Sequence, residues 1–307
     1  MNIRKVALIG AGAIGGYLIW GFDGVAGITF TVVAEGARRE RLERDGVTIN
    51  GLRYPVQVRE PGQAGPQDLI FIATKYSGLD EAVAMLPPLV GPDTLVLSLL
   101  NGVDSEERVA QAIGAEHVVH ALIRIASRRT QEGIRFDTQD PVNCICFGLP
   151  KDRAQERGKL EALSELLSRT RLGWSIPEDI RAEIWLKYAS NIANNLPQAV
   201  IGVSSSLYRR GEHGRFLAQK LWTEVAAVAA VRGIRLAEEV LIFPDRSAAA
   251  KYSTLQDLEA GRHTEIDMFA GQMLRMAAEA GISVPYCEYT YHAIKALEEK
   301  NDGLFDA

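Results

Sequence analysis

A short apolar run near the start of the chain breaks into glycines and then continues in a helical pattern, over residues 6–16. A buried parallel strand reads as continuous apolar residues, and Gly10, Gly12 and Gly15 have the G-x-G-x-x-G spacing of a dinucleotide-binding turn. We expect Gly10 to permit the tight turn, Gly12 to let a pyrophosphate approach the backbone, and Gly15 to let the helix pack closely on the strand. That helix, over residues 14–20, would aim its N-terminal amides at the phosphates. The predicted nucleotide contacts in the turn are Gly10, Ala11, Gly12, Ala13, Ile14 and Gly15.

The next predicted strand, residues 28–34, ends where a dinucleotide-binding fold recognises the adenosine ribose. An acidic residue at this point binds the 2′-hydroxyl of NAD, and an arginine binds the 2′-phosphate of NADP. Glu35 lies near the interval expected for the acid, whereas arginines follow within one turn of the next helix. These arginines, each able to reach a phosphate or simply to form a solvated helix face, are Arg38, Arg39 and Arg41. The residues by themselves leave the choice between NADP and NAD open.

Strands and helices then alternate, which predicts a parallel sheet covered on both faces. A buried strand over 68–74 ends at Lys75, and another over 94–100 ends at Asn101. Ligands of such sheets bind beyond the carboxyl ends of the strands, so we expect Lys75 and Asn101 to contribute to the site. The remaining predicted elements of this half are strands over 54–58, 117–123, 134–136 and 142–147 and helices over 79–86 and 160–167.

The pattern becomes helical after residues 175–178, which have capping-box spacing. We therefore predict two domains, an α/β Rossmann-type domain over 1–174 with helices on both faces of a parallel sheet, and an all-helical domain over 175–307. The apolar helix over 216–231 fits either the core of the second domain or a helix–helix interface, and the core is the simpler interpretation.

Composition excludes several classes of function. The chain has 307 residues and a formal net charge of −5, without the basic stripe of a nucleic-acid-binding protein. The pair Arg128-Arg129 is interpreted as a solvated face. No apolar run is long enough to span a bilayer and no signal peptide is evident, so we expect a cytoplasmic protein. Cys144 and Cys146 fall on one face of a strand as small buried hydrophobes, and no cluster has metal-ligand spacing, so no metal is expected.

Two stretches of the helical half carry polar residues in a suggestive arrangement. Lys187, Asn191 and Asn195 are spaced four residues apart and so line one face of a helix. Asparagine is a poor residue for a helix interior, and a ligand carboxylate or hydroxyl would offset that cost, although a surface face is an equally good interpretation.

The second stretch runs from Ser253 to Asp267. Thr264 and Asp267 have capping-box spacing for a helix start, which would place Glu265 at a helix N-terminus, where the helix dipole favours the ionised form. A well-capped helix without further function explains the same pattern.

Taken together, these residues resemble the ketopantoate reductase (2-dehydropantoate 2-reductase) family over nearly the whole chain. The segments that carry the resemblance are the glycine turn, Thr74-Lys75, Asn101-Gly102, Trp185-Leu186-Lys187 with Asn191 and Asn195, Leu255-Gln256-Asp257, and Thr264-Glu265-Ile266-Asp267.

The resemblance implies an NADPH-dependent reduction of 2-dehydropantoate to (R)-pantoate in pantothenate and coenzyme A biosynthesis, and it suggests a homodimer. The residue matching Lys187 is implied to donate a proton to the substrate's carbonyl oxygen, and an ammonium would also stabilise the developing alkoxide. The residue matching Glu265 is implied to contact that oxygen and hold the lysine. Substrate contacts are implied for Asn101, Asn191, Asn195 and Ser253, and Lys75 and Asn101 are implied to sit by the nicotinamide.

Two residues depart from the family pattern. Members that use NADPH usually carry an arginine where Glu35 stands, and a carboxylate there would repel a 2′-phosphate. Leu100 replaces a polar residue that often precedes the asparagine-glycine pair. The alternative function is therefore an NADH-dependent D-2-hydroxy-acid dehydrogenase acting on another 2-oxo acid. A cofactor sensor without turnover would not need Lys187 or Glu265, so an enzyme is favoured.

Overall fold

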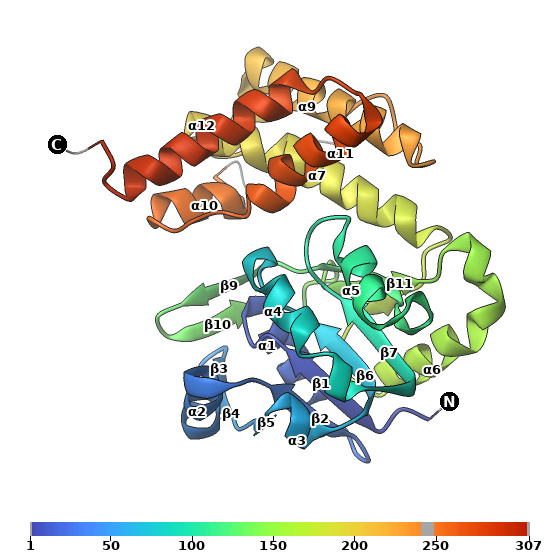
Figure 1. Ribbon diagram of the computed structural model, residues 1–307. Helices are drawn as coiled ribbons and strands as arrows, with labels where there is room; N and C mark the ends of the chain where they lie inside the picture. The colour runs from blue at the N-terminus through green and yellow to red at the C-terminus, as the bar shows by residue number, and fades with distance from the viewer. Residues whose placement is uncertain (1, 241–248, 306–307) are drawn as a thin grey trace. The chain divides into compact units, whose positions relative to one another are not determined.

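The structure is a computed structural model that describes residues 2–240 and 249–305 (Figure 1). These residues form two compact units, Met1–Arg181 and Ala182–Ala307. The division into domains at residue 174 stays a prediction. Among the described residues, no helix is long and apolar enough to cross a membrane.

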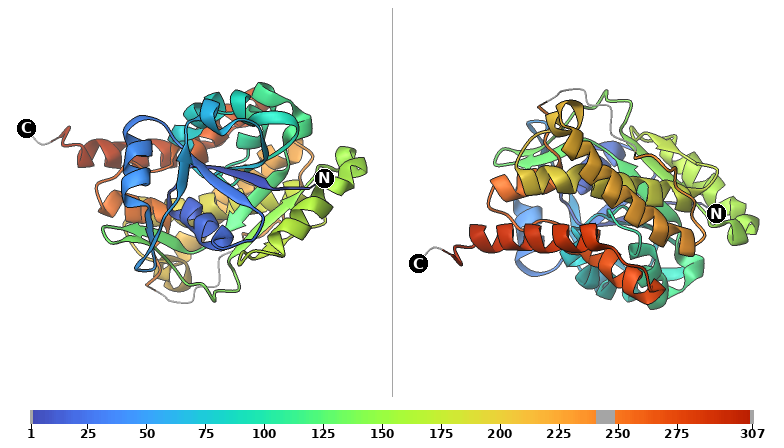
Figure 2. Two further views of the ribbon diagram at one scale, coloured as in Figure 1. Left: turned by 90° about the horizontal axis from the view of Figure 1, so that it is seen from below. Right: turned by 90° about the horizontal axis from the view of Figure 1, so that it is seen from above.

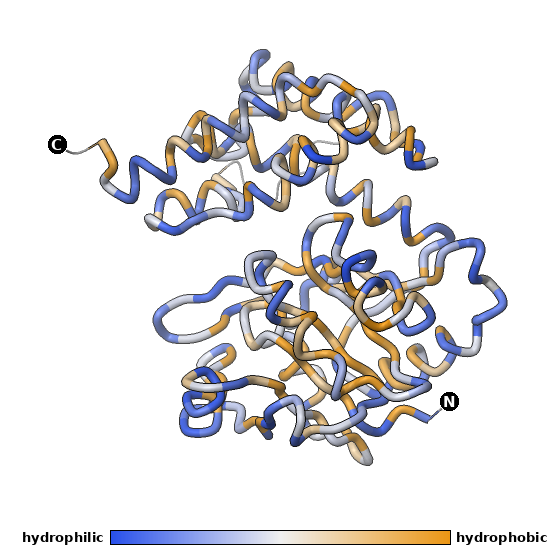
Figure 3. The backbone as a smooth tube through the Cα atoms, viewed as in Figure 1, coloured by the Kyte–Doolittle hydropathy of each residue, from blue (hydrophilic) through white to orange (hydrophobic). Residues whose placement is uncertain are grey.

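The first unit is built on a five-stranded parallel sheet with the order β5-β2-β1-β6-β7. Its strands are β1 (Lys5–Ile9), β2 (Thr29–Val33), β5 (Gln57–Arg59), β6 (Gln67–Ile72) and β7 (Val90–Ser98). In the register of the central strand, Val6 lies opposite Phe30 on one side and Leu69 on the other. Figure 3 shows the strands of this sheet as mostly hydrophobic, as expected for a sheet buried on both sides.

Alternate residues of β1 enter two different cores. Val6 and Leu8 belong to one cluster of buried residues, while Ala7 and Ile9 belong to another. Because side chains alternate across a strand, these clusters cover the two faces of the sheet, which confirms the predicted α/β class. The helices of this unit are α1 (Ala13–Phe22), α2 (Gly36–Asp45), α3 (Pro61–Ala64), α4 (Leu79–Ala84), α5 (Ser105–Ile113) and α6 (Arg157–Leu167), with short 3₁₀ turns η1 (Tyr76–Gly78), η2 (Pro87–Leu89), η3 (Ala115–His117) and η4 (Lys151–Glu156).

Two smaller sheets complete the unit. One has the order β4-β3-β10-β9 and the other β12-β11-β8. Their strands are β3 (Val47–Ile49), β4 (Leu52–Tyr54), β8 (His120–Arg124), β9 (Ser127–Thr130), β10 (Gly133–Phe136), β11 (Cys144–Gly148) and β12 (Trp174–Ser175).

The prediction of a single strand over 54–58 was wrong. The chain there belongs to two strands in different sheets, β4 ending at Tyr54 and β5 beginning at Gln57. Pro55 lies between them, and a proline has no N–H to continue a ladder.

The described residues of the second unit are helical, as predicted. Its helices are α7 (Ile180–Ile201, which begins in the first unit), α8 (Ser206–Arg210), α9 (Glu212–Val231), α10 (Ser253–Glu259), the π-helix η5 (Asp267–Gly271), α11 (Gln272–Ala280) and α12 (Pro285–Asn301). Helix α12 packs against both α9 and η5, and Figure 2 shows it as the long C-terminal helix of this unit. In α9, Trp222 and Val225 are fully buried, which supports the core interpretation, while Phe216 and Val231 are exposed at its ends. The homodimer stays a prediction.

Candidate active site

The glycine turn has the geometry that each glycine was expected to serve. Gly10 has a φ of 103°, in the left-handed region, and a Cβ there would lie 2.6 Å from the carbonyl carbon of Ala73. A Cβ on Gly15 would lie 2.0 Å from the carbonyl oxygen of Gly10, so the helix start packs directly on the turn. Gly12 differs, because a Cβ there would meet nothing within 4 Å. The backbone at Gly12, at the start of α1, is thus open, and the approach of a pyrophosphate to it stays a prediction.

Lys75 and Asn101 lie at the same edge of the sheet as this turn. Strands β1, β6 and β7 are neighbours and parallel, so their carboxyl ends meet there. The Tyr76 hydroxyl donates a 2.6 Å hydrogen bond to Asp104, which ties the turn after β6 to the loop after β7. Lys75 is exposed and Asn101 is half-buried. The structure therefore brings the predicted nucleotide and nicotinamide residues of the first unit to one edge.

The end of β2 carries groups of both charges. Glu35 is exposed and is the residue immediately before α2, and Arg38 is exposed on the first turn of that helix. Arg39 is engaged elsewhere, with ion pairs to Glu43 at 3.0 Å and Glu60 at 2.8 Å. Within the described part of the chain, Arg38 forms no such pair. Arg38, and Arg41 which is likewise exposed, are thus better placed than Arg39 to reach a phosphate.

Leu100, the second departure from the family pattern, is a core residue. It is 5% exposed and packs in the cluster that contains Ala7 and Ile9. Its side chain has a structural role in this protein.

A buried carboxyl lies on α5, close to the Asn101 loop. Glu106 is 5% exposed, accepts a 2.9 Å hydrogen bond from the Ser105 hydroxyl, and receives the Ala121 N–H at 3.4 Å. Burial raises the pKa of Glu106 to about 7. Burial also lowers the pKa of His120, the neighbour of Ala121, to about 4.

In the second unit, Lys187, Asn191 and Asn195 follow one face of α7. Lys187 and Asn191 are half-buried, and Asn195 is only 5% exposed. The amide of Asn195 lies in the interior and needs polar partners, while Lys187 and Asn191 keep part of their surface exposed. The assignment of this face to a ligand stays a prediction.

Gln198 continues this stripe and was missed in the sequence. It is fully buried, and its Oε1 accepts a 3.1 Å hydrogen bond from the backbone N–H of Tyr252. Gln198 thereby fixes the residue that precedes Ser253, which is exposed at the first position of α10. Gln198 Nε2 and Thr254 Oγ1 are buried and have no hydrogen-bond partner among the described residues. The available signal was the spacing of Gln198, three residues beyond Asn195 on the same face.

The segment around Glu265 differs from the expected capping box. The helix that follows starts as the π-helix η5, and Thr264 Oγ1 accepts a 3.1 Å hydrogen bond from the Ile266 N–H. Asp267 does not accept the Thr264 N–H as a capping box requires, because that N–H donates instead to Glu298 on α12 at 2.7 Å. π-Helices are rare and frequent at functional sites.

Tyr188 connects this segment to α7. The Tyr188 hydroxyl, next in sequence to Lys187, donates a 2.6 Å hydrogen bond to the Phe269 carbonyl in η5. Glu265 itself is half-buried. The helix that carries the lysine and the helix that follows the glutamate are thus joined inside one unit.

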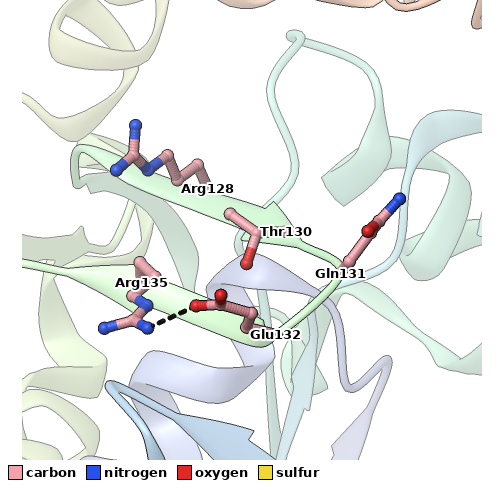
Figure 4. Close-up of a pocket in the computed structure, with 5 residues that line it drawn as sticks. All are labelled: Arg128, Thr130, Gln131, Glu132 and Arg135. Carbon is pink, nitrogen blue, oxygen red and sulfur yellow. Dashed lines mark hydrogen bonds and ion pairs between the residues drawn. The ribbon is translucent and has the colours of Figure 1, made fainter.

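A surface hollow of about 490 Å³ lies elsewhere, on the β9–β10 hairpin, and contains none of the predicted site residues (Figure 4). It is lined by Arg128, Thr130, Gln131, Glu132 and Arg135. Arg135 forms a 2.7 Å ion pair with Glu132, and Arg128 is exposed.

Two of the three cysteines lie close together on β11, and Cys287 lies on α12. The sulfurs of Cys144 and Cys146 lie 3.8 Å apart on the same strand face, and the thiols are free. Cys146 is buried as expected, but Cys144 is only half-buried. The neighbouring thiol and burial raise the pKa of Cys144, which disfavours a reactive thiolate. In the described ranges, no group of three His, Cys, Asp or Glu side chains is arranged to hold a metal ion.

Comparisons with known proteins agree with this geometry. Residues 6–143 match the family model "Ketopantoate reductase PanE/ApbA", and residues 179–298 match "Ketopantoate reductase PanE/ApbA C terminal". A 2-dehydropantoate 2-reductase of Mesorhizobium japonicum is 30% identical over 86% of this chain and 88% of its own length.

Solved structures share the fold. A ternary complex of D-mandelate dehydrogenase with NADH and anilino(oxo)acetate superposes with a TM-score of 0.83 at 21% identity, covering 97% of this chain and 99% of that one. A 2-dehydropantoate 2-reductase from Geobacter metallireducens gives a TM-score of 0.80 at 24% identity, covering 95% and 99%.

Proposed function

The chain belongs to the ketopantoate reductase family of NAD(P)H-dependent oxidoreductases, and from this premise we propose that it reduces 2-dehydropantoate to (R)-pantoate with NADPH. The observation that carries the proposal is the polar face of α7, where Lys187 and Asn191 are half-buried and Asn195 is buried, on a helix that Tyr188 joins to the η5 segment. A family member without turnover would have no use for that arrangement.

The first unit supplies the nucleotide contacts in this proposal. The open backbone at Gly12 and the N-terminal amides of α1 bind the pyrophosphate, and Arg38 binds the 2′-phosphate. Lys75 and Asn101 lie at the same sheet edge and bind the nicotinamide end. When bound, NADPH supplies the hydride that reduces C2 of the 2-oxo acid.

The second unit supplies the groups that act on the substrate. The Lys187 ammonium hydrogen-bonds the carbonyl oxygen, stabilises the negative charge that grows there, and then delivers a proton from Nζ to give the hydroxyl. The Glu265 carboxylate accepts a hydrogen bond from that same ammonium and so orients it. Asn191, Asn195 and Ser253 bind the substrate's carboxylate and hydroxyl.

A second function is favoured by Glu35. Its carboxylate sits directly before α2, where it suits the ribose hydroxyls of NADH and repels a 2′-phosphate. The resemblance in fold to a D-mandelate dehydrogenase with NADH agrees with this alternative, in which the chain reduces another 2-oxo acid to a D-2-hydroxy acid.

The test is the steady-state oxidation of NADPH and of NADH with 2-dehydropantoate and with a panel of branched and aromatic 2-oxo acids. We expect the highest kcat/KM for 2-dehydropantoate with NADPH. A clear preference for NADH and an aromatic or branched acid would replace this assignment with the D-2-hydroxy-acid dehydrogenase.

A further inference from the structure

Glu298 is a buried carboxylate that faces the segment carrying Glu265. It lies on α12, is 2% exposed, and its Oε1 accepts hydrogen bonds from both the N–H and the hydroxyl of Thr264, each at 2.7 Å. These two bonds join residues that are far apart in the sequence. A carboxylate is rarely buried this deeply unless its hydrogen bonds serve the fold or a site.

The same carboxylate is paired on its other side. Glu298 Oε2 accepts a 2.9 Å hydrogen bond from Lys295, and the ring of His263 lies 3.6 Å from it. The bond to Glu298 raises the pKa of Lys295. Lys295 also lies 3.6 Å from Asp267. Burial of the charge is thus offset by a cation and by two Thr264 donors.

These contacts hold the residues on both sides of Glu265. Before it, Thr264 is fixed by Glu298; after it, the Ile266 N–H is bound by the hydroxyl of the same Thr264. Asp267 is held by the Tyr291 hydroxyl of α12 at 2.8 Å. The backbone at 264–267 therefore takes its position both from α12 and from the helix start, where the Glu265 carbonyl accepts the N–H groups of Met268 and Phe269, each at 3.1 Å.

We propose that Glu298 is a positioning residue, which acts through Thr264 to fix the direction in which the Glu265 carboxylate points. The proposal rests on the proposed function, in which Glu265 orients the Lys187 ammonium. A carboxylate that is free to turn would leave the ammonium misaligned with the reacting oxygen, and small misplacements of reacting groups cost large factors in rate. Loss of Glu298 should therefore lower kcat and leave cofactor binding unchanged.

A matched control lies in the same unit. Glu224 on α9 is also buried, at 9% exposed, and its two oxygens accept the N–H groups of Tyr286 and Cys287, each at 2.8 Å. It fixes the start of α12 and has no bond to the 264–267 segment. Glu298→Gln and Glu224→Gln thus make the same chemical change at a buried carboxylate that accepts two hydrogen bonds from one short segment, Thr264 in the first case and Tyr286 and Cys287 in the second. Glu298 also accepts a bond from Lys295.

Kinetics provide the first test. We expect Glu298→Gln to lower kcat about tenfold with little change in KM, and Glu224→Gln to leave kcat within about twofold of wild type. Thr264→Val, which removes the hydroxyl, should follow Glu298→Gln, and Thr264→Ser, which keeps it, should restore activity. Equal kcat in Glu298→Gln and Glu224→Gln, or no difference between Thr264→Val and Thr264→Ser, would overturn the proposal.

Hydrogen exchange gives a readout that does not depend on turnover. Amides of the peptide covering 262–270 should exchange faster in Glu298→Gln than in wild type and in Glu224→Gln. Unchanged exchange there would overturn the positioning role. Failure of the wild-type enzyme to reduce any 2-oxo acid would instead contradict the proposed function, so the two failures are distinguishable.

Discussion

The two units hold their candidate residues in different ways. In the first, the residues proposed to bind the nucleotide are backbone positions and strand ends, and neighbours in the sequence fix them: Gly10, Gly12 and Gly15 lie within one turn. In the second, the candidate residues are side chains, held by bonds between distant segments, such as Tyr188 to Phe269 and Glu298 to Thr264. A backbone site can thus be encoded in a short motif, whereas a side-chain site depends on the assembled helices.

The largest expected effect is on kcat, and it should occur without a change in cofactor binding. Lys187→Ala should lower kcat about 1,000-fold, because it removes both the proton donor and the cation that stabilises the alkoxide, while the Kd for NADPH stays unchanged. Lys220→Ala is the control, since Lys220 is an exposed lysine of α9 that lies over the Phe216 ring. Stopped-flow oxidation and equilibrium titration measure the two quantities. Near-normal turnover of Lys187→Ala would remove the lysine from its role.

The second prediction concerns cofactor binding by the glycine turn of the first unit. Gly12→Val should weaken NADPH binding at least about 100-fold, or about 3 kcal/mol, because the new side chain occupies the space of the pyrophosphate. Its fold should persist, since the added Cβ meets no neighbour. Gly62→Val is matched to it, as a glycine of the same unit whose Cβ would also meet nothing within 4 Å. Equal affinities in the two variants would show that Gly12 is not at the cofactor.

A third prediction concerns stability and pH in the first unit. The pKa of Glu106 is raised to about 7, so between about pH 4.5 and 7 the folded protein binds a proton that the unfolded chain releases, and stability falls as pH rises through this window. The pKa of His120 is lowered to about 4, so between about pH 4 and 6.5 the unfolded chain binds the extra proton and stability rises with pH.

Replacing Glu106 should leave the pH dependence of stability that is due to His120. Glu106→Gln removes the decrease in stability that accompanies ionisation of Glu106. At pH 8 the free energy of unfolding of the variant should therefore exceed that of wild type by up to about 3 kcal/mol, and its stability should rise with pH between about pH 4 and 6.5, where His120 titrates. Urea unfolding at pH 5, 6, 7 and 8 measures this. Parallel pH profiles for variant and wild type would mean that Glu106 is ionised in the folded protein at neutral pH.

The smallest expected effect concerns cofactor choice. Glu35→Arg should shift the ratio of kcat/KM for NADPH over NADH about tenfold towards NADPH, because a repulsive charge becomes an attractive one. Arg38→Ala should shift the ratio the other way, and Arg41→Ala, also exposed on α2, serves as the comparison. An unchanged ratio in Glu35→Arg would assign the specificity to the arginines of α2.

The sequence predicted the first unit well because its signals are local. The glycine spacing, the two strands that end shortly before Lys75 and Asn101, at Ile72 and Ser98, and the parallel sheet all follow from patterns a few residues long. The prediction failed where partners came from elsewhere: Pro55 separates two strands that pair in different sheets, and Glu298 takes the bond expected of Asp267. Gln198 and Glu298 are ordinary helix residues until the fold brings Tyr252 and Thr264 to them.

The most direct test of the account is hydride transfer itself. The purified protein would be incubated with 2-dehydropantoate and NADPH that carries deuterium at both C4 positions of the nicotinamide, and the product identified by chiral chromatography and mass spectrometry. The account predicts (R)-pantoate carrying one deuterium at C2. Absence of deuterium from the product, both here and with every other 2-oxo acid of the panel supplied with deuterated NADPH or NADH, would contradict it.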